Sequence, residues 1–269
     1  MPEQYPASRG LSPLALPAAP AGGRGAVSAF VVTQARSEED VRDAQRLRYR
    51  VFVEEMGARL EVAEEGVDAD RFDPFCTHIL VRHGVDGPVV GTYRLLSGEG
   101  ARGAGSFIAD ELFDLAPLAE LRHRSVELGR ACVDPAMRGG VVLMLLWSAI
   151  ARYSMAQGYE YLFGCASIDR SDGGGNAARV SARLTRQHLA PPELRVAPCT
   201  RLPAPVALPR GEGRISGALK GYLRMGAWVC GEPAWDRRFD TADLLVLLPM
   251  TRFVPRYAKH FLGRTTRKA

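Results

Sequence analysis

The chain has 269 residues, of which 46% are hydrophobic and 24% are charged. This balance supplies enough apolar material for a sizeable core and excludes a fibrous or wholly unstructured protein. The formal net charge of +5 favours an acidic partner, which could be nucleic acid, an anionic membrane surface or an acidic carrier protein. Basic and aromatic residues do not alternate in any recognition motif, so we expect no nucleic-acid role.

The spacing of cysteines and the length of apolar runs indicate in which cellular compartment the protein is expected. The five cysteines are scattered and never spaced as C-x-x-C, so they predict neither a zinc site nor a disulfide framework. A reduced, cytoplasmic protein is the simplest interpretation. The longest apolar run, Val141 to Ile150, is too short to cross a bilayer, so contact with the inner face of a membrane would be peripheral.

Composition along the chain predicts one folded domain with two tails. Residues 1–28 are rich in Ala, Pro and Gly and lack periodicity, which is typical of a disordered tail. The domain is expected to span residues 29–262, followed by a basic tail at 263–269. Within it we distinguish a core at 29–190, a proline-rich loop at 190–213 and a C-terminal portion at 214–262.

The first predicted elements are a strand at 30–33 and a long helix after it. Ser37 with Asp40 approximates a capping box, and apolar residues then recur at helical spacing until Gly57. Arg48 lies on or beside this apolar stripe, so it needs an anionic partner. An arginine that reaches water from the edge of the stripe is an equally good interpretation.

The remaining elements predict a mixed α/β sheet with helices on both faces. Two strands flank a glycine-containing turn, a further segment reads as helix or loop, and a helix that is apolar nearly all round should be buried against the sheet. In chain order the expected elements are strands at 77–83 and 88–96, helix or loop at 106–121, a strand at 125–133, a helix at 141–157, and strands at 158–168 and 241–248.

The strand "SVELGRACV" carries a glutamate and an arginine three residues apart. On a regular strand, Glu127 and Arg130 would point to opposite faces of the sheet. A β-bulge at Leu128–Gly129 would insert one unpaired residue and bring both charges to one face. We therefore predict a bulge there.

The segment "DPAMRGG" joins this strand to the long apolar helix. Backbone N–H groups at a glycine-rich helix start, with Arg138 beside Gly139 and Gly140, are suited to a phosphate or pyrophosphate. A plain glycine turn is the alternative.

At these motifs the sequence resembles a known family. "LRYRVFVEE", "DADRFD", "GTYRLL" and "ELGRACVDP" are similar to the ornithine acyl-carrier-protein N-acyltransferases, which have the GCN5-related N-acyltransferase (GNAT) fold, and to the sister acyl-homoserine-lactone synthases. The later segments "YLFGCASI" and "LKGYLRMGAWVCGEPAWDRRFDTADLLVLL" resemble the ornithine enzymes alone. The resemblance covers residues 29–262 and implies a largely antiparallel mixed sheet with a C-terminal extension.

The resemblance implies transfer of a 3-hydroxy fatty acyl group from acyl carrier protein to the α-amino group of L-ornithine, giving lyso-ornithine lipid. No cofactor is implied beyond the phosphopantetheine thioester of the carrier, and no metal site is expected. One alternative is an acyl-homoserine-lactone synthase that uses S-adenosylmethionine as the amine. Another is a non-catalytic, acyltransferase-like protein that binds lipid or an acidic partner.

The reaction requires a neutral amine. At pH 7 an α-amino group with a pKa of about 8 costs roughly 1.4 kcal/mol to deprotonate, against roughly 4 to 5 kcal/mol for a lysine-like amine. Glu127 is the candidate base, directly or through water, with Arg130 as its catalytic neighbour. A structural ion pair is the alternative.

The expected substrate contacts combine both charge signs, because an amino acid presents a carboxylate and an ammonium. Arg48 and Arg94 would balance the acids, while Asp70 and Asp73 would hold the side-chain ammonium, or simply cap a turn at Pro74.

The donor is expected to lie along the second half of the strand. Backbone amides near Cys132 and Val133 would receive the thioester oxygen, and Arg138, Gly139 and Gly140 would meet the phosphate. Trp147 is expected in an apolar acyl slot together with Phe107, Phe113, Leu143 and Leu146, although each of these could equally be core.

Overall fold

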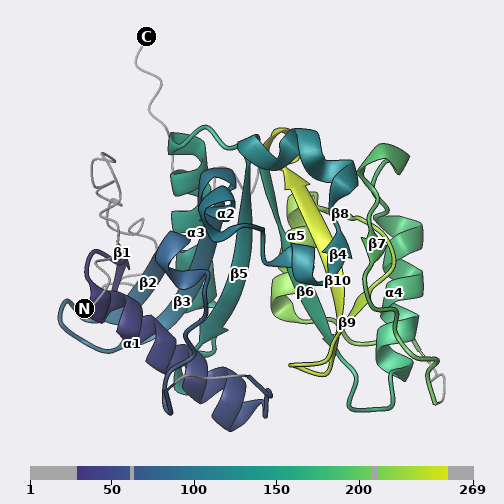
Figure 1. Ribbon diagram of the computed structural model, residues 1–269. Helices are drawn as coiled ribbons and strands as arrows, with labels where there is room; N and C mark the ends of the chain where they lie inside the picture. The colour runs from purple at the N-terminus through teal and green to yellow at the C-terminus, as the bar shows by residue number, and fades with distance from the viewer. Residues whose placement is uncertain (1–28, 61–63, 207–210, 254–269) are drawn as a thin grey trace.

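The computed structural model describes residues 29–60, 64–206 and 211–253 (Figure 1). The predicted disordered tail at 1–28, the basic tail at 263–269 and part of the proposed C-terminal portion lie outside the described residues. No helix in the described part of the chain is long and apolar enough to span a bilayer.

One eight-stranded sheet organises the molecule. Neighbouring strands are antiparallel except for β5 and β6, which run parallel, so the predicted mixed and largely antiparallel sheet is confirmed. In spatial order the strands are β1 (Phe30–Gln34), β2 (Thr77–His83), β3 (Val89–Ser97), β5 (Ser125–Val133), β6 (Tyr161–Asp169), β10 (Thr241–Pro249) and β8 (Trp228–Val229), with β9 (Ala234–Asp236) also paired to β10. A separate pair joins β4 (Phe113–Asp114) to β7 (Ala197–Pro198).

Helices cover both faces of the sheet (Figure 1). The first, called here the α1 face, carries α1 (Glu38–Tyr49), its continuation as a π-helix η2 (Arg50–Glu55), and α2 (Gly98–Ala104). The opposite α3 face carries α3 (Val141–Ala156), α4 (Gly175–Gln187) and α5 (Gly217–Met225). Short 3-10 turns lie at Asp73–Phe75 (η3), Ala109–Glu111 (η4), Ala116–Arg124 (η5), Pro135–Met137 (η6), Pro192–Leu194 (η7) and Met250–Arg252 (η8).

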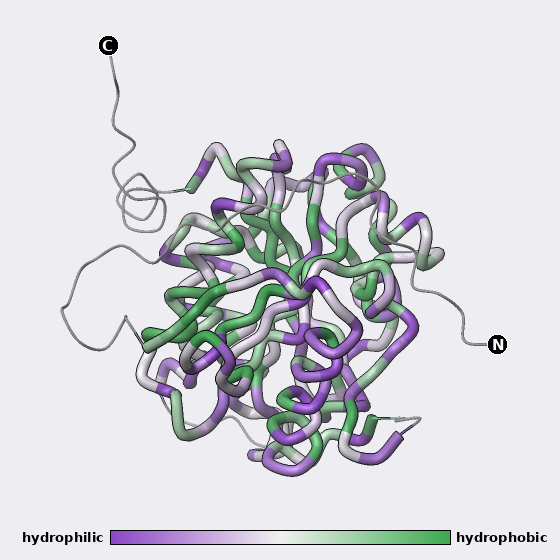
Figure 2. The backbone as a smooth tube through the Cα atoms, turned by 90° about the vertical axis from the view of Figure 1, so that its left-hand side faces the viewer, coloured by the Kyte–Doolittle hydropathy of each residue, from purple (hydrophilic) through white to green (hydrophobic). Residues whose placement is uncertain are grey.

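Local sequence explains the main elements. The Ser37 hydroxyl accepts a hydrogen bond from the backbone N–H of Asp40 at 3.1 Å, and the Asp40 carboxylate accepts one from the Ser37 N–H at 3.3 Å, so the predicted capping box is present. Helix α3 is apolar nearly all round because it is buried against β1, β2, β3 and β5. Figure 2 shows the hydrophobic residues concentrated along the inner strands.

Helices α4 and α5 lie in segments that sequence analysis left without a helix assignment. Both are amphipathic, and their buried residues join the large core on the α3 face. In α4, Ala177, Val180 and Leu184 recur at helical spacing, which is the signal that identifies such a helix.

The sheet opens between β5 and β6. The two strands pair at only three positions, Ser125–Tyr161 to Glu127–Phe163, and then diverge (Figure 1). Just beyond the last pair, a Cβ added at Gly164 would lie 2.3 Å from the carbonyl oxygen of Leu128, so glycine is what allows β6 to approach this closely. The divergence places a cavity in the middle of the sheet.

Candidate active site

A cavity of about 400 Å³ lies in the opening between β5 and β6 and reaches both faces of the sheet. Arg94 and Glu127 contribute to its wall from the α1 face, whereas Tyr93 and Tyr222 contribute from the α3 face. Further lining residues are Val51, Phe52 and Met56 after α1, Leu128 to Val133 along β5, Cys165 to Ser167 on β6, Leu219 on α5, and Asp236, Arg238, Phe239, Thr241 and Asp243 from β9, β10 and the turn between them.

A β-bulge in β5 brings Glu127 and Arg130 to the same side, at a different position from the one predicted. Gly129 still pairs with Arg94 and Cys132 with Thr92, so Arg130 and Ala131 together oppose the single residue Tyr93. The expected bulge at Leu128–Gly129 is therefore corrected to Arg130–Ala131. Arg130 has φ of 50°, a strained backbone conformation for a residue other than glycine.

Glu127 is almost fully buried at the closed end of the opening. Its two carboxylate oxygens accept hydrogen bonds from the backbone N–H groups of Ile108, at 2.7 Å, and Ala109, at 2.8 Å. Burial raises the pKa of Glu127 to about 8, although the two N–H donors and the charge of Arg94 oppose this shift. A carboxyl group with such a pKa can exchange a proton near neutral pH.

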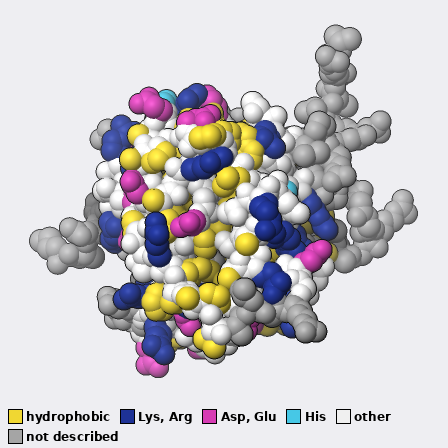
Figure 3. Space-filling model, turned by 90° about the vertical axis from the view of Figure 1, so that its right-hand side faces the viewer, with side chains coloured by type: hydrophobic (Ala, Val, Ile, Leu, Met, Phe, Trp, Pro, Cys, Tyr) yellow, Lys and Arg dark blue, Asp and Glu magenta, His cyan; other side chains and the backbone are white. Residues whose placement is uncertain are grey.

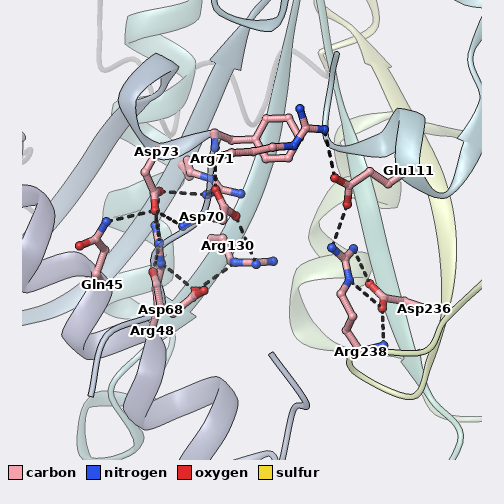
Figure 4. A network of polar contacts seen from close by, with 12 residues as sticks. Gln45, Arg48, Asp68, Asp70, Arg71, Asp73, Glu111, Arg130, Asp236 and Arg238 are labelled. Atoms are coloured by element: carbon pink, nitrogen blue, oxygen red, sulfur yellow. Dashed lines mark hydrogen bonds and ion pairs between the residues drawn. The ribbon is translucent and has the colours of Figure 1, made fainter. Parts of the chain in front are cut away.

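A network of three arginines and three aspartates lies on the α1 side of the cavity, and two of its members, Arg94 and Arg130, line the cavity wall (Figure 4). Asp73 lies at its centre, where both carboxylate oxygens accept hydrogen bonds from Arg48, at 2.9 and 2.8 Å, and one also accepts from Arg94 at 2.9 Å. Burial alone would raise the pKa of Asp73, but these two guanidinium groups hold it well below its usual range. The negative charge of Asp73 is thereby balanced inside the protein by the positive charges of Arg48 and Arg94.

Arg48 has the anionic partners that the sequence predicts, Asp68 and Asp73, whereas contact of Arg48 and Asp73 with the substrate stays a prediction. Neither lines the cavity, and their side chains are 0% and 2% exposed. Asp70 lies between them and the opening, where it pairs with Arg94 at 2.7 Å and with Arg130 at 3.4 Å. Asp68, which sequence analysis did not single out, pairs with Arg48 and Arg130, each at 3.0 Å, and completes the network.

Arg94 keeps part of its hydrogen-bonding capacity free. Its Nη1 donates to Asp70 and Asp73, whereas its buried Nε and Nη2 have no partner in the described part of the chain. Leaving charged donors unpaired away from water is costly, so the free edge of Arg94 is suited to an anionic or carbonyl oxygen of a ligand. The prediction that Arg94 lies at the site agrees with this geometry.

The opposite wall, formed by β9, β10 and the turn between them, carries an acidic group that sequence analysis missed. Arg238 bridges Asp236 and Glu111 (Figure 4). Asp243 is 4% exposed and accepts a hydrogen bond from the Thr241 hydroxyl at 2.7 Å. Among residues 29–60, 64–206 and 211–253, no Lys or Arg forms an ion pair with it, and burial raises its pKa to about 6. An aspartate inside the apolar strand "TADLLVLL" was the available signal.

The predicted donor contacts are only partly at the cavity. Cys132, Val133 and Arg138 line it, whereas Gly139 and Gly140 do not. Arg138 forms a two-pronged ion pair with Glu55, at 2.5 and 2.7 Å, so an incoming phosphate would share or replace that partner.

The residues predicted for the acyl slot do not line the cavity. Trp147 lies behind Tyr93 and Tyr222 and does not line the cavity. The residues expected beside it, which are Phe107, Phe113, Leu143 and Leu146, are likewise absent from the lining. A helix that is apolar on every side does not reveal from its sequence which face meets a cavity.

The parting of β5 and β6 agrees with the GNAT class of acyltransferases that the sequence predicts, and a family model described as "Acetyltransferase (GNAT) domain" matches residues 47–148. The chain belongs to the L-ornithine Nα-acyltransferase family within this class. It is 36% identical over 251 residues to the L-ornithine N(alpha)-acyltransferase of Rhodobacter capsulatus, covering 87% of this chain and 95% of that protein. The Brucella abortus enzyme of the same name is 34% identical, with 90% and 92% covered.

Solved structures share the fold. A CoA-dependent acyl-homoserine lactone synthase, solved with SAM and isopentyl-CoA, superposes with a TM-score of 0.53 at 16% identity, covering 84% of this chain and 85% of that one. An N-acyl amino acid synthase from uncultured soil microbes gives 0.51 at 13% identity, covering 83% and 93%.

Proposed function

We propose that this protein transfers a fatty acyl group from the thioester of acyl carrier protein to the α-amino group of L-ornithine. The observation that carries the proposal is Glu127, a buried carboxyl group at the point where β5 and β6 separate. The relatives named L-ornithine N(alpha)-acyltransferase support ornithine as the amine.

The chemistry needs one proton to move before a C–N bond forms. The pKa of Glu127, about 8, is close to that of an α-ammonium group, so the transfer between them is nearly balanced. The neutral nitrogen then attacks the thioester carbonyl, the C–N bond forms, the C–S bond breaks, and the carrier thiol leaves with the second proton that the attacking nitrogen gives up. Arg94 lines the cavity and has two nitrogens without a hydrogen-bond partner among the described residues, so it is suited to hold the carboxylate of the amino acid.

The side-chain ammonium of ornithine is best matched by Asp243, in place of Asp70 and Asp73. The latter two already share Arg94 between them, and Asp73 is held by Arg48 as well. Asp243 lines the same cavity and pairs with no cation among the described residues. An ammonium ion there would supply the missing positive charge.

The net charge of +5 supports an acidic carrier as the donor's protein. Lys and Arg side chains are spread over the side of the molecule that carries α4 and β7 (Figure 3). Helix α4 contributes Arg179, Arg183 and Arg186, all at least partly exposed. The cytoplasmic location and peripheral membrane contact expected from sequence remain predictions.

The test supplies the purified protein with acyl carrier protein charged with a 3-hydroxyacyl chain and with each amine in turn. Mass spectrometry should show an Nα-acylated ornithine. Exclusive formation of a homoserine lactone from S-adenosylmethionine would overturn the choice of amine, and absence of any acylated product would overturn the enzyme.

A further inference from the structure

One short loop supplies both N–H groups that hold Glu127. Residues 106–112, called here the base loop, contain η4. The backbone N–H groups of Ile108 and Ala109 donate to the two oxygens of the Glu127 carboxyl group at 2.7 and 2.8 Å. Both hydrogen bonds favour the charged form, so they lower the pKa of Glu127 against the effect of burial. The position of this loop therefore affects how strongly Glu127 holds a proton.

Core packing fixes the two ends of the base loop more firmly than its outer turn. Phe107 within the loop and Phe113 just after it are each 1% exposed and belong to the core on the α1 face. Between them, the side chain of Glu111 is 32% exposed. The N–H of Glu111 donates to the carbonyl oxygen of Ile108 at 3.1 Å, which links the outer turn to one of the two donor residues. The position of this turn depends on contacts with other parts of the chain.

Glu111 connects the base loop to both halves of the opened sheet (Figure 4). Arg71, which precedes β2, donates to one oxygen of the Glu111 carboxylate at 3.3 Å. Arg238, in the turn between β9 and β10, donates to the other oxygen at 2.8 Å and also pairs with Asp236. These four residues form a row of alternating charges, and such networks contribute more than isolated surface ion pairs. The outer turn is thus held from both sides of the opening.

We propose that Glu111 is a positioning residue whose two ion pairs keep the base loop where its N–H groups hydrogen-bond to Glu127. Without the ion pairs the outer turn shifts, the two hydrogen bonds weaken, and the protonated form of Glu127 is favoured. Glu111 itself contacts neither the amine nor the thioester. The role assigned to it rests on the proposed function, in which Glu127 is the base.

Other titratable side chains also face Glu127, and they stay in place when Glu111 is changed. They are Arg94 on β3, Asp110 on η4, Cys76 before β2 and Cys165 on β6. The charge of Arg94 lowers the pKa of Glu127 and that of Asp110 raises it. Burial raises the pKa of both thiols, so they are neutral near pH 7 and add no charge.

The sign of the change in pKa separates the proposed role from a direct effect of charge. Glu111→Gln removes a negative charge, which by itself would favour ionised Glu127 and lower its pKa. Weaker hydrogen bonds from the base loop would raise the pKa of Glu127 instead. A rise in this variant therefore has to come through the loop.

The test measures the pKa of Glu127 by ¹³C NMR titration of protein labelled at its glutamate carboxyl carbons, without substrate. The signal of Glu127 is the one that Glu127→Gln lacks. Glu111→Gln should raise this pKa by about 0.5 to 1, the most that two partly exposed ion pairs can supply. On the acid limb of the pH profile, kcat/KM for ornithine should fall by about threefold to tenfold, with little change on the alkaline side.

Glu160→Gln is the matched control, because Glu160 is also a partly exposed partner of an arginine, Arg124, but lies outside the cavity lining. It should leave both the pKa of Glu127 and the pH profile unchanged. An unchanged or lowered pKa in Glu111→Gln, or an equal rise in the control, would overturn the role of Glu111 and leave the proposed function intact. If ornithine is not acylated, the proposed function fails, and the substrate-free titration still decides whether Glu111 positions the loop.

Discussion

The two sides of the cavity differ in how their buried carboxylates are paired. On the α1 side, three arginines and three aspartates neutralise one another, and Asp73 alone bonds to two of the arginines. On the β10 side, Asp243 is just as buried but accepts hydrogen bonds from hydroxyl groups, those of Thr241 and Ser167, and forms no ion pair with a cation in the described structure. A buried carboxylate that is already paired supports the wall, whereas one without a cation is available to a ligand.

Removing a charge from the paired wall should have the largest effect. Asp73→Asn leaves Arg48 and Arg94 with one negative partner fewer, which should destabilise the fold by about 3–5 kcal/mol. Urea denaturation of both proteins measures this change in the free energy of unfolding. Glu39→Gln, which removes an exposed partner of Arg46, is the control and should cost less than about 1 kcal/mol. An equally small change for Asp73→Asn would contradict the structural role of the network.

Glu127 lies between the walls and should matter for rate. Glu127→Gln cannot accept a proton, so turnover should fall by about a hundredfold or more while donor binding is retained. Steady-state kinetics with a parallel thermal-shift titration of the donor separates the two quantities. Turnover equal to that of the wild type would remove Glu127 from the mechanism.

A change on the unpaired wall should affect recognition. Asp243→Asn should raise KM for ornithine by about tenfold or more with little change in kcat, because a charge-assisted hydrogen bond is lost. It should also remove the preference for ornithine over norleucine, whose side chain is apolar. Asp240→Asn, on the exposed turn before β10, is the control. If KM for ornithine does not move, the ammonium lies elsewhere.

The same variant should also change how the stability of the folded protein depends on pH. The pKa of Asp243 is about 6 in the folded protein and about 3.9 when unfolded, so the folded state binds the proton more tightly. Wild-type stability should therefore fall as pH rises through this window, by at most about 3 kcal/mol, and then level off. In Asp243→Asn this part of the pH dependence of the free energy of unfolding should be absent. Urea midpoints at about pH 4.5 and about pH 7.5 that differ equally in both proteins would contradict the shift.

Sequence reasoning was most accurate for local features of the backbone around the candidate site. The spacing of Glu127 and Arg130 required a bulge, and the structure has one. Its position was missed because Arg130 takes up its left-handed conformation beside Asp68, which lies 62 residues earlier in the chain. Such a partner leaves no trace in the strand's own sequence.

The roles of the acids were harder to predict than their presence. Asp70 and Asp73 stand out in "DADRFD", but only coordinates show that arginines from α1 and β3 neutralise them. Asp243 could have been found by the argument used for Glu127, namely a carboxylate in a buried strand. The hydrogen bond between the hydroxyl groups of Tyr93 and Tyr222 could not have been found from sequence, because these residues are 129 positions apart.

The sheet is continuous only through the three residue pairs that join β5 to β6. Beyond Glu127, β5 keeps its ladder with β3 but faces an opening on its other side. Amide protons directed into that opening have no carbonyl of β6 opposite them, so they should exchange with solvent faster than those on the β3 side. A pantetheine arm seated there would slow their exchange, which makes the backbone itself a reporter of donor occupancy.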